Sequence, residues 1–263
     1  MEATTMNDRE RFLACMAYEP VDRIPYRPQG FWSATLKRWR SEGMPPDASP
    51  AEHFGFDDWR YLRVNVDMLP LHEERVLETH GTWQLMVDEH GITKKQLIEN
   101  SELSMPEWVD FPVKTADDFE RMKERYDASD PARYPRDWAD RVEQWEGRDY
   151  VLGLDLYHGL YMTLRQWMGP EGLLYAFMDQ PDLVHEMLEF YADFLVQVLG
   201  RALEDVDIDY VSFSEDMAYK CGPFISPAMF REFFFPRYYR LAELFHGHGV
   251  ETFAVDSDGY PEP

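Results

Sequence analysis

Polar and ionisable side chains follow five short apolar stretches of this chain. They are Arg27 and Gln29, Asn65 and Asp67, Asp155 with Tyr157 and His158, Glu215 with Asp216, and Asp256 with Asp258. Carboxylates that meet in a partly dry cleft raise one another's pKa values and can then act as general acids and bases. The acidic pairs that begin at Glu215 and Asp256 are the strongest candidates, because like charges held together cost stability unless a proton, a hydrogen bond or a cation relieves them. This pattern favours an enzyme.

The single residues of this set each have a structural alternative. Asp67 either caps the turn after a strand or binds a ligand. Arg27 forms a buried ion pair or contacts a substrate, and His158 is either a packed core histidine or a catalytic one. Both alternatives stay open for each residue at the level of sequence.

Strands and helices alternate along the chain and must position these residues. Apolar stretches predict strands at 24–27, 61–68, 150–156, 209–214 and 251–255, and helices at 7–18, 31–42, 50–54, 160–168, 181–204 and 226–246. The 75–97 segment alternates with period two, which predicts an antiparallel excursion after the second strand. Residues 101–148 are predicted to be mainly acidic helix and loop, and Pro236 is predicted to kink the last helix.

The alternation predicts a parallel α/β sheet in one domain over residues 1–263. No GxGxxG motif follows the first strand, which disfavours a dinucleotide-binding fold. We expect an incomplete (β/α)8 TIM barrel with about five of the eight β/α units, in which the last strand lies at an open edge and a C-terminal part is missing. Barrel enzymes place their chemistry where the strands end, which is where the polar side chains fall.

Composition narrows the classes of partner. The chain has 50 acidic and 26 basic residues, a net charge of −24 and a pI of about 4.6, which disfavours nucleic acid and anionic membrane surfaces. Its two cysteines, Cys15 and Cys221, give neither a disulfide framework nor a CxxC site. The N-terminus lacks the apolar core of a signal peptide, and no apolar run is long enough to span a membrane. A cytoplasmic location is expected.

Five segments spread over nearly the whole chain form a recognisable series. They read Arg9-Glu-Arg-Phe-Leu, Glu19-Pro-Val-Asp-Arg-Ile-Pro, Gly159-Leu-Tyr-Met-Thr-Leu-Arg-Gln-Trp-Met-Gly, Gln180-Pro-Asp-Leu-Val and Gly222-Pro-Phe-Ile-Ser-Pro-Ala-Met-Phe-Arg-Glu-Phe-Phe-Phe-Pro-Arg. In order and spacing the chain resembles the uroporphyrinogen decarboxylase superfamily, which also contains cobalamin-linked methyltransferases. The resemblance implies a (β/α)8 barrel, and implies that roughly three units, on the order of 80 residues, lie outside this sequence.

The resemblance also implies roles for individual residues. The decarboxylases bind substrate carboxylates with two arginines after the first strand, and only Arg27 of the stretch Arg27-Pro-Gln-Gly-Phe matches one of them. Asp67 corresponds to the aspartate that holds pyrrole N–H groups. The methyltransferases bind zinc through a His-x-Cys after the fifth strand, where this chain has Asp256-Ser-Asp258. Two carboxylates there suit a hard divalent cation better than zinc.

Three functions follow as hypotheses. The first is decarboxylase-type acid–base chemistry on a tetrapyrrole-related or carboxylated small molecule, with no required cofactor. In this hypothesis Asp67, His158, Glu215 and Asp216 are catalytic. The substrate-binding residues are Arg27, Gln29, Asp155 and Tyr157. The second is methyl transfer of the methylcobamide-to-thiol type, with a corrinoid protein as partner. The third is a non-catalytic truncated relic. A second copy of the chain, in a homodimer, is one candidate partner, and neither nucleic acid nor membrane is expected.

Overall fold

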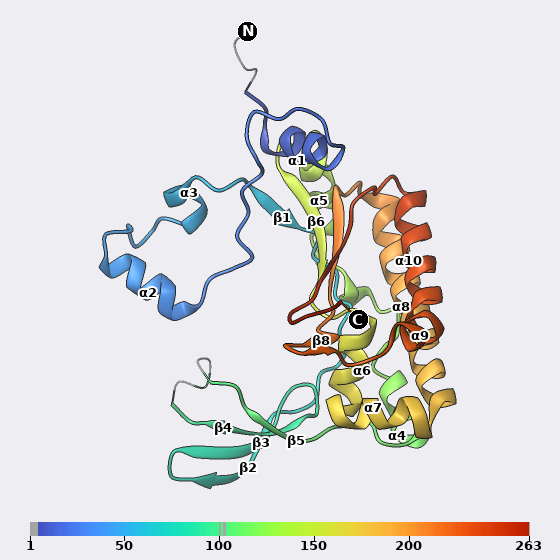
Figure 1. Ribbon diagram of the computed structural model, residues 1–263. Helices are drawn as coiled ribbons and strands as arrows, with labels where there is room; N and C mark the ends of the chain where they lie inside the picture. The colour runs from blue at the N-terminus through green and yellow to red at the C-terminus, as the bar shows by residue number, and fades with distance from the viewer. Residues whose placement is uncertain (1–4, 100, 102–103, 263) are drawn as a thin grey trace.

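The computed structural model describes residues 5–99, 101 and 104–262 of the chain. Its central sheet has four parallel strands in the order β1-β6-β7-β10 (Figure 1). These strands are β1 (Trp59–Tyr61), β6 (Val151–Leu156), β7 (Tyr210–Ser214) and β10 (Phe253–Asp256). β1 and β10 are the two edges, so the sheet within the described residues is open and not closed into a barrel. The architecture is a parallel α/β arrangement compatible with part of an α/β barrel.

The two faces of the central sheet differ in chemistry because side chains alternate along each strand. In β7, Val211 and Phe213 are fully buried, whereas Ser212 and Ser214 on the other face are only partly buried. Asp155 of β6 is paired in register with Ser212 and lies on that same face. One face therefore packs on helices, and the other is polar.

The helices of the second half cover the apolar face. They are α6 (Leu160–Met168), α7 (Pro170–Asp179), α8 (Pro181–Asp205) and α10 (Phe235–Gly247). Figure 1 shows α8 and α10 side by side on one side of the sheet, and the two helices are in contact. The predicted buried stripe of α8, including Val184, Met187 and Leu195, is confirmed. Among the described residues, no helix combines the length and the apolar character that crossing a membrane requires.

The helix predicted at 226–246 is interrupted near Pro236, as expected. It consists of α9 (Pro227–Met229), a π-helical turn η3 (Phe230–Phe234) and α10. Pro236 stands in the first turn of α10, where a missing N–H leaves no hydrogen bond unmade. The irregularity therefore falls just before the proline.

The antiparallel excursion is confirmed, and it is larger than predicted. Its sheet has the order β2-β3-β4-β5, with β2 (Arg75–His80), β3 (Trp83–Val87), β4 (Thr93–Leu97) and β5 (Glu107–Asp110). β5 lies in the segment predicted to be helix and loop, so that assignment was wrong for these four residues. The rest of that segment holds α4 (Ala116–Lys123), the 3-10 turn η2 (Pro131–Arg133) and α5 (Trp138–Trp145).

Two of the predicted strands are corrected by the structure. Residues 24–27 form no strand, because the N–H of Tyr26 donates to the Asp57 carboxylate at 2.6 Å and not to a neighbouring strand. The predicted strand 61–68 begins earlier and is short: β1 ends at Tyr61, and Asn65 N already donates to the Arg133 carbonyl at 2.7 Å. The parallel sheet therefore has four strands and not five. A further difference is the helix α7, which was not predicted.

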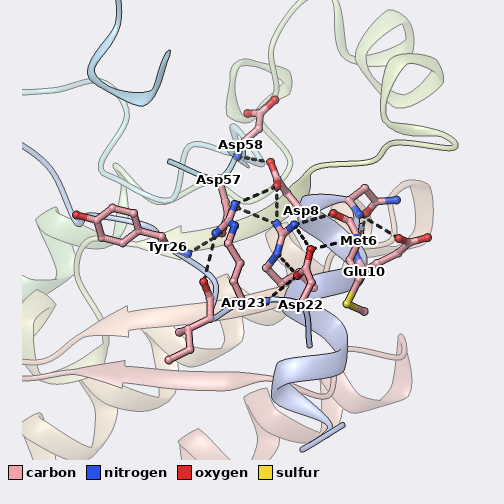
Figure 2. A network of polar contacts seen from close by, with 11 residues as sticks. Met6, Asp8, Glu10, Asp22, Arg23, Tyr26, Asp57 and Asp58 are labelled. Atoms are coloured by element: carbon pink, nitrogen blue, oxygen red, sulfur yellow. Dashed lines mark hydrogen bonds and ion pairs between the residues drawn. The ribbon is translucent and has the colours of Figure 1, made fainter. Parts of the chain in front are cut away.

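A buried ion network fixes the N-terminal segment on the sheet (Figure 2). Arg11 in α1 (Asp8–Met16) is 4% exposed and reaches Asp8, Asp22 and Asp57 at 2.7, 2.7 and 3.0 Å. Arg23 also pairs with Asp57. This network holds residues 22–26 at the edge of β1, and so determines where the following residue, Arg27, lies.

Beyond this segment, α2 (Ser33–Ser41) and α3 (Pro50–Phe54) project from the body of the molecule (Figure 1). Aromatic rings join the two helices, with Trp39 in edge contact with both Phe31 and Phe54. The projection has its own small aromatic cluster, which explains how two short helices keep their places away from the main core.

Candidate functional site

A cleft of about 1000 Å³ lies over the polar face of the central sheet. Residues from all four strands and from the segments that follow them line it. Its polar and aromatic lining is Phe12, Arg27, Gln29, Trp59, Tyr61, Arg63, Asp155, Tyr157, Tyr210, Ser212, Ser214, Asp216, Thr252, Asp256 and Asp258. The strand alternation explains this set, because alternate positions of β1, β6, β7 and β10 share one face.

Arg27 lines the cleft and contacts four of its other lining residues. Its Nε donates to the hydroxyl of Tyr61 at 2.9 Å, and its Nη2 contacts the Asp155 carboxylate at 3.1 Å. Its guanidinium carbon lies 5.1, 5.3 and 5.9 Å from the ring centres of Trp59, Tyr61 and Tyr210. Burial acts to lower the pKa of Arg27, but the Tyr61 hydrogen bond and nearby groups outweigh it and the pKa is raised. Arg27 stays a cation held between rings and a carboxylate.

Hydrogen bonds hold two of the cleft carboxylates in place. The Ser212 hydroxyl donates to Asp155 Oδ1 at 2.7 Å, and the Gln29 amide donates to Asp256 Oδ2 at 2.5 Å. The first contact links β7 to β6, and the second ties the N-terminal loop to the end of β10. Gln29 thus contacts a protein carboxylate, and its predicted role toward a substrate stays a prediction.

At the rim of the cleft, Asp216 follows β7 and lies beside the segment that follows β10. Its Oδ1 is 3.4 Å from the backbone nitrogen of Asp258, and Arg165 of α6 approaches its Oδ2 at 3.8 Å. The cleft lining thus includes four carboxylates, on Asp155, Asp216, Asp256 and Asp258, against the guanidinium groups of Arg27 and Arg63. Because Arg27 is paired with Asp155, the remaining charged groups of the lining are three carboxylates and the Arg63 guanidinium, and their net charge is negative.

The cleft floor contains residues that the sequence did not single out. Phe12, Trp59 and Tyr210 make mutual edge contacts with ring centres 4.9–5.7 Å apart. Gly153 makes room for Tyr210, because a Cβ at that position would lie 1.9 Å from its ring. The alternation along β7 indicates in the sequence which residues share the polar face: Tyr210, Ser212 and Ser214 alternate with the apolar Val211 and Phe213. The residue types alone did not suggest a site.

Glu215 does not line the cleft. Its side chain is 0% exposed and accepts N–H groups of Tyr161 at 3.0 Å and Met162 at 2.9 Å, at the start of α6. Burial raises the pKa of Glu215 to about 8, although these backbone N–H groups favour the ionised form. A Cβ on Gly159 would meet its carboxylate, so the glycine admits the side chain to the helix N-terminus. Structurally, Glu215 caps α6 from within the core.

Asp67 and His158 form a second group, outside the residues that line the cleft. His90 Nε2 lies 2.8 Å from Asp67 Oδ2, and this hydrogen bond raises the pKa of His90. Burial opposes the ionised form of Asp67, yet His90 and other contacts leave its pKa below the usual range. Burial lowers the pKa of His158, which interacts electrostatically with Asp67 and His90. His90 was missed, because it comes from the turn between β3 and β4.

Their positions at the ends of the predicted strands predict that Arg27, Asp67, Asp155, His158, Glu215, Asp216 and Asp258 share one cleft, and the structure brings four of these seven together. Arg27, Asp155, Asp216 and Asp258 line it, with Gln29, Tyr157 and Asp256 from the wider set of candidates. Asp67, His158 and Glu215 lie elsewhere. The strand alternation accounts for two of these, because Glu215 and His158 each follow a cleft-facing position by one residue.

The predicted metal ligands Asp256 and Asp258 do not form a three-ligand cluster in the part of the chain that the structure describes. There, the group with suitable spacing is Asp88, Glu89 and His90, whose ligand atoms lie within 4.8 Å of one another. The nearly buried Asp88 already accepts backbone N–H groups of His90 and Ile92 and pairs with Lys94 at 3.1 Å. A metal at Asp256 and Asp258 stays a prediction.

Of the comparisons with known proteins, only the structural one finds a similar protein, and it concerns the fold. No protein-family model and no curated protein matches the chain. A methyltransferase from Methanosarcina mazei is similar in structure, with a TM-score of 0.52 and 15% sequence identity over 97% of this chain and 70% of that one. At this identity the likeness concerns the arrangement of strands and helices alone.

Proposed function

We propose that this chain performs methyl transfer, and that its cleft binds a methylated, positively charged small molecule. The observation that carries the proposal is the lining of the cleft, where four carboxylates stand against two guanidinium groups and aromatic rings form the floor. A methylated ammonium group suits such a lining, because it is attracted by carboxylates and by the faces of aromatic rings. The similarity in fold to a methyltransferase supports the same choice.

The same lining disfavours the decarboxylase hypothesis. A substrate with several carboxylates would meet Asp216, Asp256 and Asp258 at the rim, and each like-charge approach costs free energy. Arg27, which the family resemblance relates to substrate carboxylates, is already paired with Asp155 at 3.1 Å. A polyanionic substrate would therefore have to break this ion pair and overcome the field of the rim.

The chain's own residues have defined tasks in this proposal. Trp59, Tyr61 and Tyr210 form an apolar floor that excludes water from the methyl groups, and Asp155 orients the positive charge. The carboxylates at the rim raise the local concentration of a cationic substrate. A corrinoid carried by a partner protein would supply the cobalt centre that accepts the methyl group.

The zinc–thiolate site of the related methyltransferases does not fit this chain. The tip of β10 offers the carboxylates of Asp256 and Asp258, and Asp256 is engaged by Gln29 at 2.5 Å. Zinc sites that activate a thiol use cysteine and histidine ligands. We therefore expect protein purified without added metal to contain little zinc in elemental analysis, and methyl transfer to a thiol to be weak. About one tightly held zinc per chain would contradict this and would favour the methylcobamide-to-thiol type.

The charge of the ligand is tested by calorimetry with choline and its neutral isostere 3,3-dimethylbutan-1-ol. We expect choline to bind about tenfold more tightly, because cation–π and carboxylate attraction contribute roughly 1–2 kcal/mol. Asp256→Asn is expected to weaken choline binding, whereas Asp117→Asn, which changes an exposed residue of α4, serves as a control of equal charge change. Equal binding of the two compounds, or tighter binding of citrate, would overturn the cationic substrate.

Turnover is tested separately with free cob(I)alamin as methyl acceptor. Mass spectrometry would follow the conversion of a methylated ammonium compound to the amine with one methyl group fewer. In this reaction the C–N bond breaks, the methyl group passes to the acceptor and the amine keeps the electron pair. Demethylation that requires the protein supports methyl transfer, and its absence with every ammonium compound that binds would refute it.

A further inference from the structure

We propose that the floor of the cleft is a cation-binding box, made by Trp59, Tyr61, Tyr210 and Asp155, and that Arg27 occupies it until a methylated ammonium group displaces it. The inference rests on the proposed function and adds where the charged group binds and which residue competes for that place. It assigns to Arg27 the role of an internal competitor, in contrast to the substrate-binding role predicted from the sequence.

The contacts of Arg27 are those that a bound ammonium ligand would make. Three aromatic rings lie within 6 Å of its guanidinium carbon, at 5.1, 5.3 and 5.9 Å. Six ångströms is the range over which the face of a ring attracts a cation, and aromatic boxes of this kind recognise quaternary ammonium groups. Asp155 completes the box with a carboxylate at 3.1 Å. The structure thus contains a cation in the box, supplied by the chain itself.

Two buried polar atoms in the floor lack the partners that such atoms normally have. Trp59 Nε1 and the Tyr210 hydroxyl are each shielded from solvent and make no hydrogen bond. Tyr210 as a whole is 4% exposed, and an unpaired buried donor costs about 1–3 kcal/mol. Both residues line the cleft beneath Arg27. Removal of the Arg27 side chain from the box would give these two atoms access to a ligand or to water.

The surroundings allow Arg27 to leave while the box keeps its shape. Arg27 belongs to a segment without helix or strand, and its side chain is 22% exposed. The rings stand on β1 and β7, and Asp155 is held on β6 by the Ser212 hydroxyl at 2.7 Å. The chain just before Arg27 is anchored by the hydrogen bond from Tyr26 N to Asp57. Only the side chain of Arg27 has to move.

The test is the affinity for tetramethylammonium chloride, measured by calorimetry on the full chain. In Arg27→Ala the box has no internal cation, so we expect the dissociation constant to fall at least tenfold. The matched control is Arg63→Ala, because Arg63 also lines the cleft and is exposed, and no hydrogen bond or ion pair of its side chain is found in the part of the chain described. It removes the same charge from the same cleft without opening the box, so its dissociation constant should fall less than twofold, which is the effect of general electrostatics alone.

A second variant guards against the case in which Arg27→Ala does not fold. Tyr61→Phe keeps the ring but removes the oxygen to which Arg27 donates, so it weakens the hold on Arg27. We expect it to tighten tetramethylammonium binding by a factor of about three, with an unfolding temperature near that of the wild type. Circular dichroism of each variant establishes that the compared proteins are folded.

The outcomes separate this inference from the proposed function. Tighter binding by Arg27→Ala and Tyr61→Phe but not by Arg63→Ala supports the box. Equal tightening by the two arginine variants means that general electrostatics is responsible, and unchanged or weaker binding by both box variants means that Arg27 does not compete. Either result overturns the inference while cationic binding stands. If no protein in the series binds tetramethylammonium, the proposed function fails with it.

Discussion

The substitution Glu215→Gln removes a fully buried acid whose pKa burial raises from 4.5 to about 8. Below pH 4.5 this acid is protonated in both the folded and the unfolded chain. Between pH 4.5 and 8 the folded protein keeps the proton while the unfolded chain releases it, so unfolding becomes more favourable as the pH rises. The wild-type protein should therefore lose stability across this window and lose no more from this group above pH 8.

The size of the effect follows from the two pKa values. A shift of one pKa unit corresponds to about 1.4 kcal/mol, so Glu215 makes the free energy of unfolding fall by roughly 5 kcal/mol over the window. Glutamine has no proton to release and abolishes this dependence. Its amide also places N–H donors against the N–H groups of Tyr161 or Met162, which should lower stability at pH 5 by about 1–3 kcal/mol.

Urea unfolding of both proteins at pH 5, 6, 7 and 8 measures the effect. Other titrating groups, such as His90, are common to both proteins and cancel in the difference. The stability of the wild type minus that of Glu215→Gln, about 1–3 kcal/mol at pH 5, should fall by about 1.4 kcal/mol per pH unit, so it changes sign between about pH 6 and 7 and the variant is the more stable protein at pH 8. Glu251→Gln, which changes an exposed glutamate, serves as control and should keep the wild-type slope. Parallel pH profiles for wild type and Glu215→Gln would refute the reasoning.

Three further predictions concern the supports of the site. Asp57→Asn should lower the free energy of unfolding by about 3–5 kcal/mol in urea, because it leaves two arginines without their buried partner. An unfolding midpoint equal to that of the wild type would contradict it. Gly153→Ala should lower the free energy of unfolding by about 1–3 kcal/mol and weaken choline binding, since its Cβ would lie 1.9 Å from the Tyr210 ring. Urea unfolding and calorimetry with choline check these two effects. Asp67→Asn should lower the pKa of His90 toward 6.5 in NMR titration, because the hydrogen bond that the His90 ring donates to the Asp67 carboxylate is the main cause that raises it. An unchanged His90 titration would exclude that pair.

The sequence alone determined the local elements and much of the cleft. Apolar periodicity placed β6, β7 and β10 and the long helix α8, because the period of the pattern dictates which residues can be buried together. Carboxylates at or just after the strand ends were predicted to converge, and Asp155, Asp216 and Asp258 do line one cleft. This worked because the carboxyl ends of parallel strands meet at one edge of a sheet.

Tertiary structure decided which neighbours in the sequence share a site. Asp216 reaches the cleft while Glu215 is buried under α6, because successive residues of a strand point to opposite faces. His90 meets Asp67 only because the antiparallel sheet folds back against the loop after β1. The box around Arg27 depends in the same way on rings from β1 and β7, brought together by strand pairing through β6. Contacts between distant segments are set by strand order and register, which local sequence patterns do not specify.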